Sequence, residues 1–452
     1  MHRRAHTDRD ERGVAMIMTI IVIMIAASLA ALILTQGTST ERRSGRGANW
    51  NEALQAADAG VNEAVARLEA DAGVVPAVQP LVGQTADGSY EVTVQRFPRG
   101  RYQIDSIGRS GTGAGLQTER HVRVIMAPPV SFEYALFSLT DVSTKNNDTV
   151  NGDIWANGNV TVELGDEVYG NVVAATGYVT MENNSLIEGD VETGGYNSSG
   201  EAMDLRQVVG NVKASSTSPN CSDDAGHSKY RIVGGTVTGN AQSWGATISS
   251  TVTGTKITHV CTAAPETKPM PTFNFNPALY DPTPTTFASV AAFQTFLGSN
   301  GNGLSGVYFV SGAGTINLNG LSVGGDLMII AEEAQIWSNG VDAANNSDKL
   351  FILVTFYDGG DSSVCTDNGG NPDGCAIGLK NNFQPSDNTA TLIYAPNGPV
   401  AFKNNAEFLG AVYGSNIVLK NNMVVTYDAR VDQVLGFGPV TLERESWIEI
   451  SD

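Results

Sequence analysis

The sequence predicts a mainly β protein: a long N-terminal α-helix, a small antiparallel sheet and then a parallel β-helix-like solenoid. Three observations favour this fold class. An uncharged apolar run extends from Val14 to Leu34, the composition includes 50 Gly with many Asn, Thr and Val, and a glycine-centred repeat begins after residue 131. β-Branched residues favour strands, and Gly and Asn favour tight turns, so most of the chain is expected to be β.

Residues 1–13 are predicted to be a charged leader peptide, and residues 14–36 a transmembrane helix. Only Thr19 and Ser28 interrupt the apolar character between Val14 and Leu34. At 1.5 Å per residue this run is roughly 30 Å long, which matches the hydrocarbon core of a bilayer. It is longer than the core of a typical secretory signal, and no Ala-x-Ala cleavage site follows it. We therefore expect a membrane anchor.

A second helical pattern covers residues 48–72, after a polar stretch that contains Gly37, Gly45 and Gly47. Its apolar residues recur at three- and four-residue steps, which indicates an amphipathic helix. The stripe consists of Trp50, Leu54, Ala57, Val61, Ala64, Val65 and Leu68. Because the opposite face is charged, this helix is too polar to enter a bilayer, and its stripe must cover another element.

Residues 81–128 are predicted to supply that element as a small antiparallel sheet. Three runs alternate polar and apolar residues, and Gly-rich or Pro-Arg-Gly turns separate them. The runs are Tyr90–Phe97, Arg101–Ile107 and Glu119–Met126. Helix and sheet then give each other a surface to bury. Pro128-Pro129 marks the boundary of this unit.

An internal repeat follows, in which an apolar residue, a spacer, Gly, Asn or Asp, and a small or β-branched residue recur. Its glycines are Gly152, Gly170, Gly189, Gly210 and Gly239. A second signature is a paired asparagine, found at Asn146-Asn147, Asn183-Asn184, Asn381-Asn382, Asn404-Asn405 and Asn421-Asn422. The first three glycine steps, 18, 19 and 21 residues, suit one coil of a β-solenoid.

The solenoid domain is expected to cover residues 131–452. Gly and Asn accept the positive φ that solenoid corners require, and stacked Asn side chains can bond along the axis. An immunoglobulin-like sandwich array is the alternative, although it would not give a repeat of one coil's length. Residues 263–300 interrupt the pattern with a proline-rich insertion and a short helix near Phe287–Leu297. The tail Val440–Ile450 is expected to close the end of the solenoid.

Charge is distributed unevenly between the two parts of the chain. Residues 1–130 carry 14 Arg and 13 acids, whereas residues 131–452 carry 13 Lys and Arg against 34 acids. The acidic part should repel nucleic acid and anionic lipid surfaces, so no nucleic-acid partner is expected. Solubility explains this charge, and cation binding is the alternative.

The four cysteines all lie in the predicted solenoid. Cys365 and Cys375 close a polar, turn-rich loop and are expected to form a disulfide, and Cys221 with Cys261 would form a second one. Zinc is the competing interpretation, but no Cys-x-x-Cys motif occurs. Paired cysteines beyond a membrane segment fit an oxidising compartment, which places this domain outside the cytoplasm.

No cofactor is expected, except that the loop closed by Cys365 and Cys375 offers weak calcium ligands. These are Asp367, Asn371 and Asp373. Their oxygen atoms and the neighbouring glycines suit calcium, but the spacing is not that of an EF-hand loop. A disulfide-closed turn explains the same residues.

The enzymatic alternative is a membrane-tethered β-helix polysaccharide lyase or hydrolase. Its best acid pairs are Asp428 with Asp432, and Glu332 with Glu333. Solvated surface explains both pairs as well, and no nucleophile elbow, His-Glu-x-x-His or phosphate loop appears. The protein is therefore not expected to be an enzyme, and no catalytic residue is assigned.

The order of the N-terminal motifs resembles that of type IV pilin-like proteins, most closely the PilX-type minor pilins. The resemblance covers roughly residues 9–126 and rests on Arg12-Gly13, the apolar run and Gln55-Ala-Ala-Asp-Ala-Gly60. The C-terminal half resembles the solenoid that often follows in such proteins, through Ile393-Tyr-Ala-Pro-Asn397 and Ala406-Glu-Phe-Leu-Gly-Ala-Val412.

This resemblance implies that prepilin peptidase cuts between Gly13 and Val14. It also implies a minor pilin or pseudopilin whose N-terminal helix contacts other pilin-like subunits and the membrane. The chain would be a single-pass protein of the inner (cytoplasmic) membrane with its C-terminal domain outside, reaching the pilus or cell surface after assembly, where it could serve in adhesion to an unidentified ligand. Major pilins place a glutamate fifth in the mature chain, where this sequence has Met18. That difference suits a filament tip, or a membrane-anchored surface protein that does not polymerise.

Overall fold

The computed structural model divides the chain into two compact units, one made of residues 1–127 with 442–452 and the other of residues 128–441. Each unit is described by itself. The residues that the structure describes are 10–70, 75, 78–80, 81–96, 102–110, 118–127, 132–216, 228–260, 262–280, 283–343, 349–359, 365, 374–381, 383–385, 388–434 and 443–450.

The first unit begins with a single helix, α1, from Asp10 to Ala70. The predicted membrane and amphipathic helices are therefore two halves of one element. The stretch with Gly37, Gly45 and Gly47, which separates the two predicted helices, is helical as well. Glycine weakens a helix by only about 1 kcal/mol relative to Ala, which the neighbouring helix formers offset.

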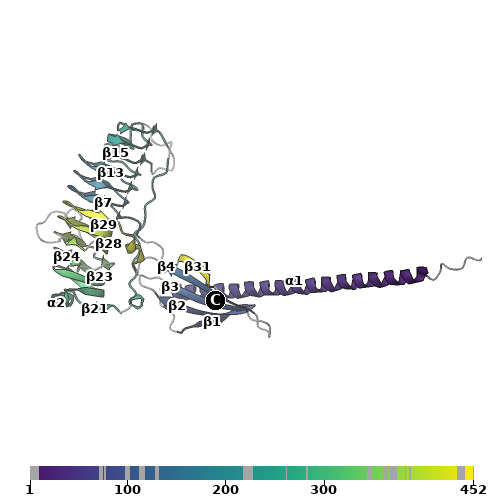
Figure 1. Ribbon diagram of the computed structural model, residues 1–452. Helices are drawn as coiled ribbons and strands as arrows, with labels where there is room; N and C mark the ends of the chain where they lie inside the picture. The colour runs from purple at the N-terminus through teal and green to yellow at the C-terminus, as the bar shows by residue number, and fades with distance from the viewer. Residues whose placement is uncertain are drawn as a thin grey trace, which may run out of the picture. The chain divides into compact units, whose positions relative to one another are not determined.

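Sheet A completes the first unit. Its strand order is β1-β2-β3-β4-β31, and every neighbouring pair is antiparallel. The strands are β1 (Leu81–Gln84), β2 (Gly88–Arg96), β3 (Tyr102–Ser110), β4 (Glu119–Ala127) and β31 (Glu443–Ile450). One face of β2, β3 and β4 packs on the C-terminal half of α1, and this contact forms the core of the unit (Figure 1).

Small residues make the closest contact between α1 and sheet A. The hydroxyl of Ser106 donates a hydrogen bond to the carbonyl oxygen of Ala57 at 2.7 Å. A Cβ on Gly60 would lie 2.6 Å from both Ser106 Oγ and Val92 Cγ2, and a Cβ on Gly108 would overlap the backbone of Ala57. Helix and sheet therefore approach each other at a distance that only glycine permits.

The predicted apolar stripe is partly confirmed. Ala57, Val61, Ala64 and Leu68 are fully buried. Trp50, Leu54 and Val65 are only half-buried, whereas Ala53, Ala56 and Gly60 are buried. The three- and four-residue spacing of apolar residues favours the large side chains. The close approach of α1 to the sheet instead places the small residues at the centre of the contact.

The C-terminal tail lies elsewhere than expected. Instead of closing the solenoid, β31 pairs with β4, so that Trp447 lies opposite Val124. The indole N–H of Trp447 also donates to the Asp58 carboxylate on α1 at 3.2 Å. The solenoid is therefore inserted in the sequence between two adjacent strands of sheet A, and its boundary is not the predicted 131–452. An alternating strand pattern does not reveal which sheet it joins.

The second unit is the solenoid, built from parallel strands, which excludes the antiparallel sandwich alternative. Its N-terminal coils stack β5 on β8 and β11, β6 on β9 and β12, and β7 on β10 and β13. The strands are β5 (Leu136–Ser138), β6 (Val142–Thr144), β7 (Thr149–Asn151), β8 (Ile154–Ala156), β9 (Val160–Val162), β10 (Glu167–Val168), β11 (Val172–Ala174), β12 (Val179–Met181), β13 (Leu186–Ile187), β14 (Val191–Thr193), β15 (Glu201–Val208), β16 (Val212–Ala214), β17 (Arg231–Val237), β18 (Ala241–Ser243), β19 (Thr251–Val252) and β20 (Lys256–Thr258).

The glycine repeat marks one corner of these coils. A Cβ on Gly189 would overlap the carbonyl of Gly170 in the preceding coil, and one on Gly210 would overlap that of Gly189. The following Asn or Asp side chain accepts a hydrogen bond from the same position of the next coil: Asp190 N donates to Asn171 at 3.0 Å, and Asn211 N to Asp190 at 2.7 Å. The repeat therefore encodes stacking.

The C-terminal coils do not continue from the end of the N-terminal coils. They stack on the first coil, because Val412 pairs with Leu136 and Val425 with Val150, both in parallel. Figure 1 shows β29 beside β7, although they lie far apart in the sequence. These strands are β21 (Thr285–Phe287), β22 (Leu304–Asn317), β23 (Leu321–Ser338), β24 (Val341–Ala343), β25 (Lys349–Thr355), β26 (Ile377–Lys380), β27 (Phe383–Gln384), β28 (Thr389–Lys403), β29 (Glu407–Val418) and β30 (Val424–Thr426).

The contact between the first coil and the C-terminal coils, which we call the seam, is crossed by an asparagine ladder. Each side-chain amide donates to the side-chain oxygen of the next rung, from Asn146 to Asn421 at 3.2 Å, to Asn404 at 2.9 Å, to Asn381 at 3.0 Å and to Asn339 at 2.7 Å. Four of these residues, all but Asn339, have positive φ. The paired-asparagine signature is thus confirmed as a corner and as a hydrogen-bonded column.

The predicted proline-rich insertion is the connection between the two halves of the stack. Residues 262–280, the return segment, run across the seam on the outside of the coils. Lys268 contacts Tyr134 and Trp155 of the N-terminal coils, with its ammonium 4.7 Å from each ring centre. Farther along, the Pro271 carbonyl accepts a hydrogen bond from Tyr394 of the C-terminal coils. The segment contains the 3-10 helix η2 (Pro277–Leu279).

A second hydrophobic cluster lies under the return segment, outside the coils. Phe273 and Tyr280 of the segment are buried against outward-facing residues of β23, β25, β28 and β29. The 3-10 helix η3 (Ala429–Gln433) adds Val431 to this cluster. The outward face would otherwise expose a large apolar patch, which the return segment and η3 cover.

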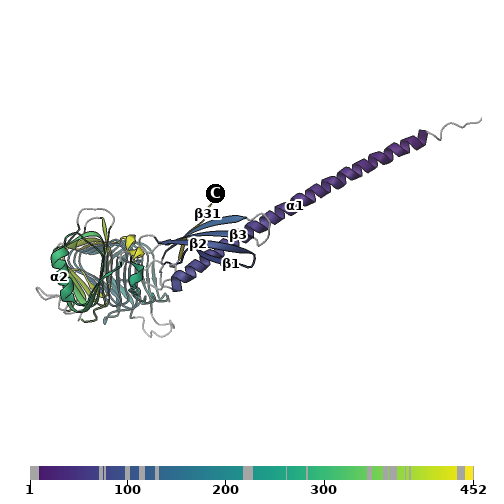
Figure 2. The same ribbon diagram turned by 90° about the horizontal axis from the view of Figure 1, so that it is seen from below.

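Helix α2 (Val290–Asn300) covers one end of the stack, and it matches the short helix predicted near Phe287–Leu297. Ser289 caps its N-terminus by accepting a hydrogen bond from Ala292 N at 3.3 Å. Phe293 of α2 is fully buried and packs against Phe287 and Tyr308. Figure 2 views the unit from this end.

We predict that Gly108→Ala destabilises the first unit by about 1–3 kcal/mol, because the new methyl group overlaps the helix backbone. Thermal unfolding of the detergent-extracted chain measures the effect. Gly47→Ala is the matched control, since a Cβ there meets nothing within 4 Å. It should be neutral or stabilising, and equal losses in the two variants would contradict the close helix–sheet contact.

Gly189→Ala should likewise destabilise the solenoid by about 1–3 kcal/mol, because its Cβ overlaps the Gly170 carbonyl of the preceding coil. Urea unfolding followed by circular dichroism measures the loss. Gly298→Ala on α2, where a Cβ meets nothing within 4 Å, serves as its control. A Gly189→Ala variant as stable as this control would show that coils do not stack through this corner.

Candidate functional site

The candidate functional site of the first unit is the exposed apolar half of α1. Residues Ile17–Gln36 are a segment of α1 that is long and apolar enough to span a membrane. Its mean hydropathy is 2.9, and none of it is buried. Ile33 and Leu34 are 68% and 69% exposed. In water this surface would be costly, so it requires a lipid or protein environment.

The hydroxyl groups of this segment are satisfied within the helix. Ser28 Oγ donates to the Met24 carbonyl oxygen at 2.7 Å, and Thr35 Oγ1 lies 2.9 Å from the Ala31 carbonyl oxygen. An unsatisfied polar group in hydrocarbon costs several kcal/mol, so these bonds suit a lipid-exposed helix. A signal sequence is also apolar and lies near the N-terminus, but here the same helix continues into the core of a folded unit.

Gly13 and Val14, the predicted cleavage pair, lie in the first turns of α1. The cleavage itself stays a prediction. Met18, the fifth residue after the predicted cut, is 61% exposed on the apolar surface. An acid at this point would place a charge on the exposed apolar surface of the helix, whereas methionine places none.

Cys365 and Cys375 form the expected disulfide, with their Cα atoms 4.8 Å apart. Both are buried against Ala401 of β28, so the bridge fastens the loop between β25 and β26 to the stack. Cys221 and Cys261 lie outside the described residues, and their pairing stays a prediction.

The weak calcium candidates Asp367, Asn371 and Asp373 also lie outside the described residues. Asp358, which precedes them, is exposed. Within the part of the chain that the structure describes, no group of three or more His, Cys, Asp or Glu side chains is arranged to hold a metal ion.

Asp428 and Asp432, the best carboxylate pair for catalysis, take part in two different structural contacts. Asp428 caps η3 by accepting from Arg430 N at 2.9 Å, and the Arg430 guanidinium binds its carboxylate at 2.6 Å. Asp432 instead lies 2.9 Å from the hydroxyl of Tyr427. The pKa of Asp432 is raised to about 6, chiefly by burial and to a smaller extent by Glu133 and Asp428, while the hydrogen bond from Tyr427 lowers it. Glu332 and Glu333 are both exposed on β23.

Sequence reasoning missed a buried carboxylate at the seam. Asp148 is 1% exposed and accepts hydrogen bonds from Met423 N at 2.8 Å and from Lys145 N at 2.7 Å. It thereby joins the first coil to the last. The pKa of Asp148 is raised to about 7, chiefly by burial and to a smaller extent by Asp166 and Glu163, while the backbone hydrogen bonds from Met423 and Lys145 lower it.

A sequence signal for Asp148 did exist. It follows an asparagine pair, where the corresponding pair at Asn421-Asn422 is followed by the apolar Met423. Because the apolar Met423 occupies the same position after its asparagine pair, this position is expected to lie inside the stack. The acid at the equivalent position, Asp148, is then expected to be buried.

No protein-family model and no curated protein sequence matches the chain. Among solved structures, the chain is similar to the competence-associated pilin ComZ from Thermus thermophilus, at 11% identity and a TM-score of 0.20, over 88% of this chain and 97% of that one. A TM-score this low does not establish a shared fold.

We predict that the free energy of unfolding falls as pH rises from about 4 to about 7. The raised pKa of Asp148 means that the folded state binds more protons than the unfolded state in this window. The stability from this group is therefore present at low pH and lost as pH rises through the folded pKa. Asp148→Asn should make the slope shallower in urea titrations at several pH values.

Glu188→Gln, which removes an exposed carboxylate of the same domain, is the control for this pH series. It should keep the wild-type slope. If Asp148→Asn and Glu188→Gln give the same slope as the wild type, Asp148 is not the group that links folding at the seam to pH.

Proposed function

We propose that this chain is a non-enzymatic, pilin-like membrane subunit of a type IV pilus or related filament assembly that displays an acidic β-solenoid outside the cell. The observation that carries the proposal is α1 itself. One uninterrupted helix of 61 residues has an exposed apolar half and a second half packed on an antiparallel sheet. A helix of this kind can leave a bilayer and pack among like helices.

The two halves of α1 differ in how their surfaces are satisfied. From Ala53 to Leu68 the buried face is covered by sheet A, whereas none of the described residues covers Ile17–Gln36. In the membrane, lipid covers the latter segment. In a filament, the apolar segments of neighbouring subunits would cover it, and transfer between the two environments needs no refolding because both are apolar.

The position of the solenoid in the sequence supports display. It is inserted between β4 and β31, so its two chain connections lead to adjacent strands of sheet A. The Cys365–Cys375 disulfide favours an oxidising compartment, and the excess of acids keeps the domain soluble. Export to the far side of the membrane satisfies all three features.

A non-enzymatic role is part of the proposal. The Asp428 carboxylate is held by Arg430 in the cap of η3, and Asp432 supports Tyr427 beside the seam. Both acids thus have structural partners. Polysaccharide cleavage would need two carboxylates on either side of one substrate bond.

Met18 suits a subunit at a filament tip, and it also favours a second arrangement, in which the processed subunit stays in the membrane and does not polymerise. The hydroxyls of Ser28 and Thr35 bond within the helix, so the anchor needs no neighbouring helix to complete its hydrogen bonds. An anchor of this kind is stable in lipid alone. Adhesion to a surface ligand is compatible with either arrangement.

We predict that N-terminal sequencing of the membrane-extracted protein begins at Val14. Gly13→Leu should abolish processing and leave an intact Met1, because a side chain at this position obstructs the peptidase. Gly47→Leu, at an open position of the same helix, is the control and should be processed as the wild type is. A wild-type chain that begins at Met1 or near residue 40 would contradict the proposed processing.

The location of the processed chain then separates the two arrangements. Recovery in sheared surface filaments, with cross-links from residues 17–36 to other pilin-like subunits, supports assembly. Recovery of all processed chains as membrane monomers supports the non-polymerising anchor and excludes the filament role.

A further inference from the structure

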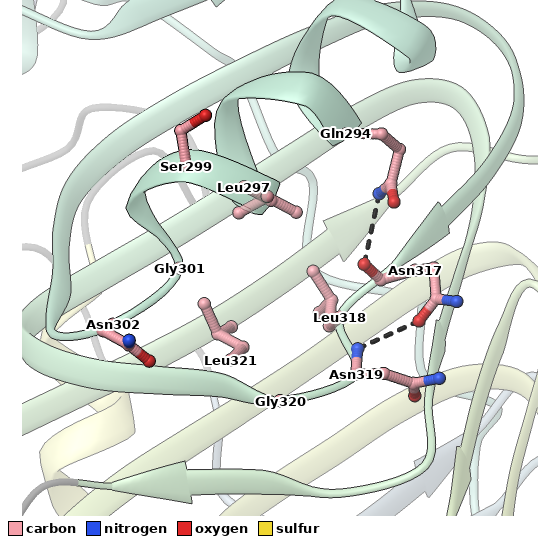
Figure 3. A pocket seen from close by; sticks show the side chains of 11 residues that line it. Gln294, Leu297, Ser299, Gly301, Asn302, Asn317, Leu318, Asn319, Gly320 and Leu321 are labelled. Atoms are coloured by element: carbon pink, nitrogen blue, oxygen red, sulfur yellow. Dashed lines mark hydrogen bonds between the residues drawn. The ribbon is translucent and has the colours of Figure 1, made fainter.

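A polar pocket lies at the α2 end of the stack. It has a volume of about 380 Å³ and lies between the C-terminal turn of α2 and the turn from β22 to β23. Figure 3 shows its wall of amide side chains and the leucines that converge on its floor. Four amides line it: Gln294, Asn302, Asn317 and Asn319.

The asparagine ladder ends at this pocket. Asn339, which accepts from Asn381 in the ladder, donates its backbone N–H to the side-chain oxygen of Asn319 at 2.6 Å. In the rungs above, each amide nitrogen donates to an oxygen of the next rung toward α2. No rung follows Asn319, because α2 takes the place of a further corner. Within the described residues its amide nitrogen has no hydrogen-bond acceptor.

Gln294 and Asn317 add further unused groups. Gln294 Nε2 donates to the Asn317 backbone carbonyl at 3.1 Å, and the Asn317 side-chain oxygen accepts from Asn319 N at 2.9 Å. These bonds, drawn as dashed lines in Figure 3, hold the amides in place. They leave Gln294 Oε1 as an acceptor and Asn317 Nδ2 as a donor, without other partners among the described residues.

The lining selects a class of ligand by its chemistry. Amides and the Ser299 hydroxyl offer donors and acceptors, while the half-buried Leu297 offers apolar contact, since Leu318 and Leu321 are buried in the core of the stack. Among the residues that the structure describes, no charged and no aromatic side chain lines the pocket. The domain also carries a large excess of acids, which disfavours an anionic ligand. A neutral molecule with several hydroxyl groups and apolar C–H faces satisfies all of these conditions.

We propose that this pocket binds one or two residues of a neutral saccharide. Sugar hydroxyls would bond to Asn319 Nδ2, Asn317 Nδ2 and Gln294 Oε1, and the ring C–H groups would pack against Leu297. The volume of the pocket, about 380 Å³, lies in the range of small-molecule sites. The pocket goes beyond the proposed filament role, since saccharide binding needs neither leader cleavage nor assembly.

Isothermal titration and saturation-transfer NMR on the full chain test this proposal, in an amine-oxide detergent that contains no sugar. The probes are glucose, galactose, N-acetylglucosamine, lactose and cellobiose, with glucuronate as the anionic match for glucose. At least one neutral sugar should bind with a dissociation constant of about 1 mM, and glucuronate should bind at least about tenfold more weakly than glucose. No binding by any neutral sugar at about 20 mM, or equal binding of glucuronate, overturns the proposal.

Two matched variants locate the site. A Cβ on Gly298 meets nothing within 4 Å, so Gly298→Phe can fill the pocket without disturbing the core, and it should weaken binding at least about tenfold. Ala291→Phe places the same side chain at an exposed position of α2 outside the pocket and should keep the wild-type affinity.

Asn302→Ala, which removes an exposed amide from the wall, provides a second pocket variant with less effect on folding. Full affinity in both pocket variants overturns the location.

The outcome is distinguishable from failure of the filament role. A chain that begins at Met1 but binds a neutral sugar through Gly298-sensitive contacts keeps this inference and refutes the leader processing. A chain processed at Val14 that binds no sugar refutes this inference alone.

Discussion

Close approach of backbone to backbone at the corners is the constraint on which the solenoid depends. Parallel coils can share hydrogen bonds only if their corners come near enough, and any Cβ at Gly189 or Gly210 would prevent this. Asparagine at the other corners accepts positive φ and adds a side-chain bond to each neighbouring coil. The core of valine and isoleucine then fills the space that these corners define.

The seam follows from the same constraint. The first coil presents the corner at Asn146 with open hydrogen-bond positions on one side, and the coil containing Asn421 supplies the matching groups. The chain therefore enters the stack at an internal coil and builds away from it in one direction. It then returns along the outside to the α2 end. From there it adds the C-terminal coils, and the last of these meets the first coil at the seam. Asp148 is buried because it lies where the two halves meet.

The first unit solves a different problem with the same residue type. Gly60 and Gly108 let α1 lie close to sheet A, which fixes one half of the helix in a folded unit and leaves the other half without cover. An exposed apolar helix, a small antiparallel sheet and an acidic solenoid are thereby joined in one chain. The pocket beside Asn319 arises where the asparagine ladder ends, so a structural repeat produces unpaired groups that a ligand can use.

The sequence alone determined what depends on local spacing: the apolar helix from Val14 to Leu34, the coil-forming glycines and asparagine pairs, and the loop between Cys365 and Cys375. These features are readable because each corner or helical turn imposes its own residue type. Only the tertiary structure decided which coils are neighbours, that β31 joins sheet A, and that Asp148 and the end of the ladder at Asn319 have their particular surroundings. Equivalent coils present equivalent hydrogen-bonding edges, so a repeat cannot specify its own stacking order. That order follows from pairing between segments hundreds of residues apart.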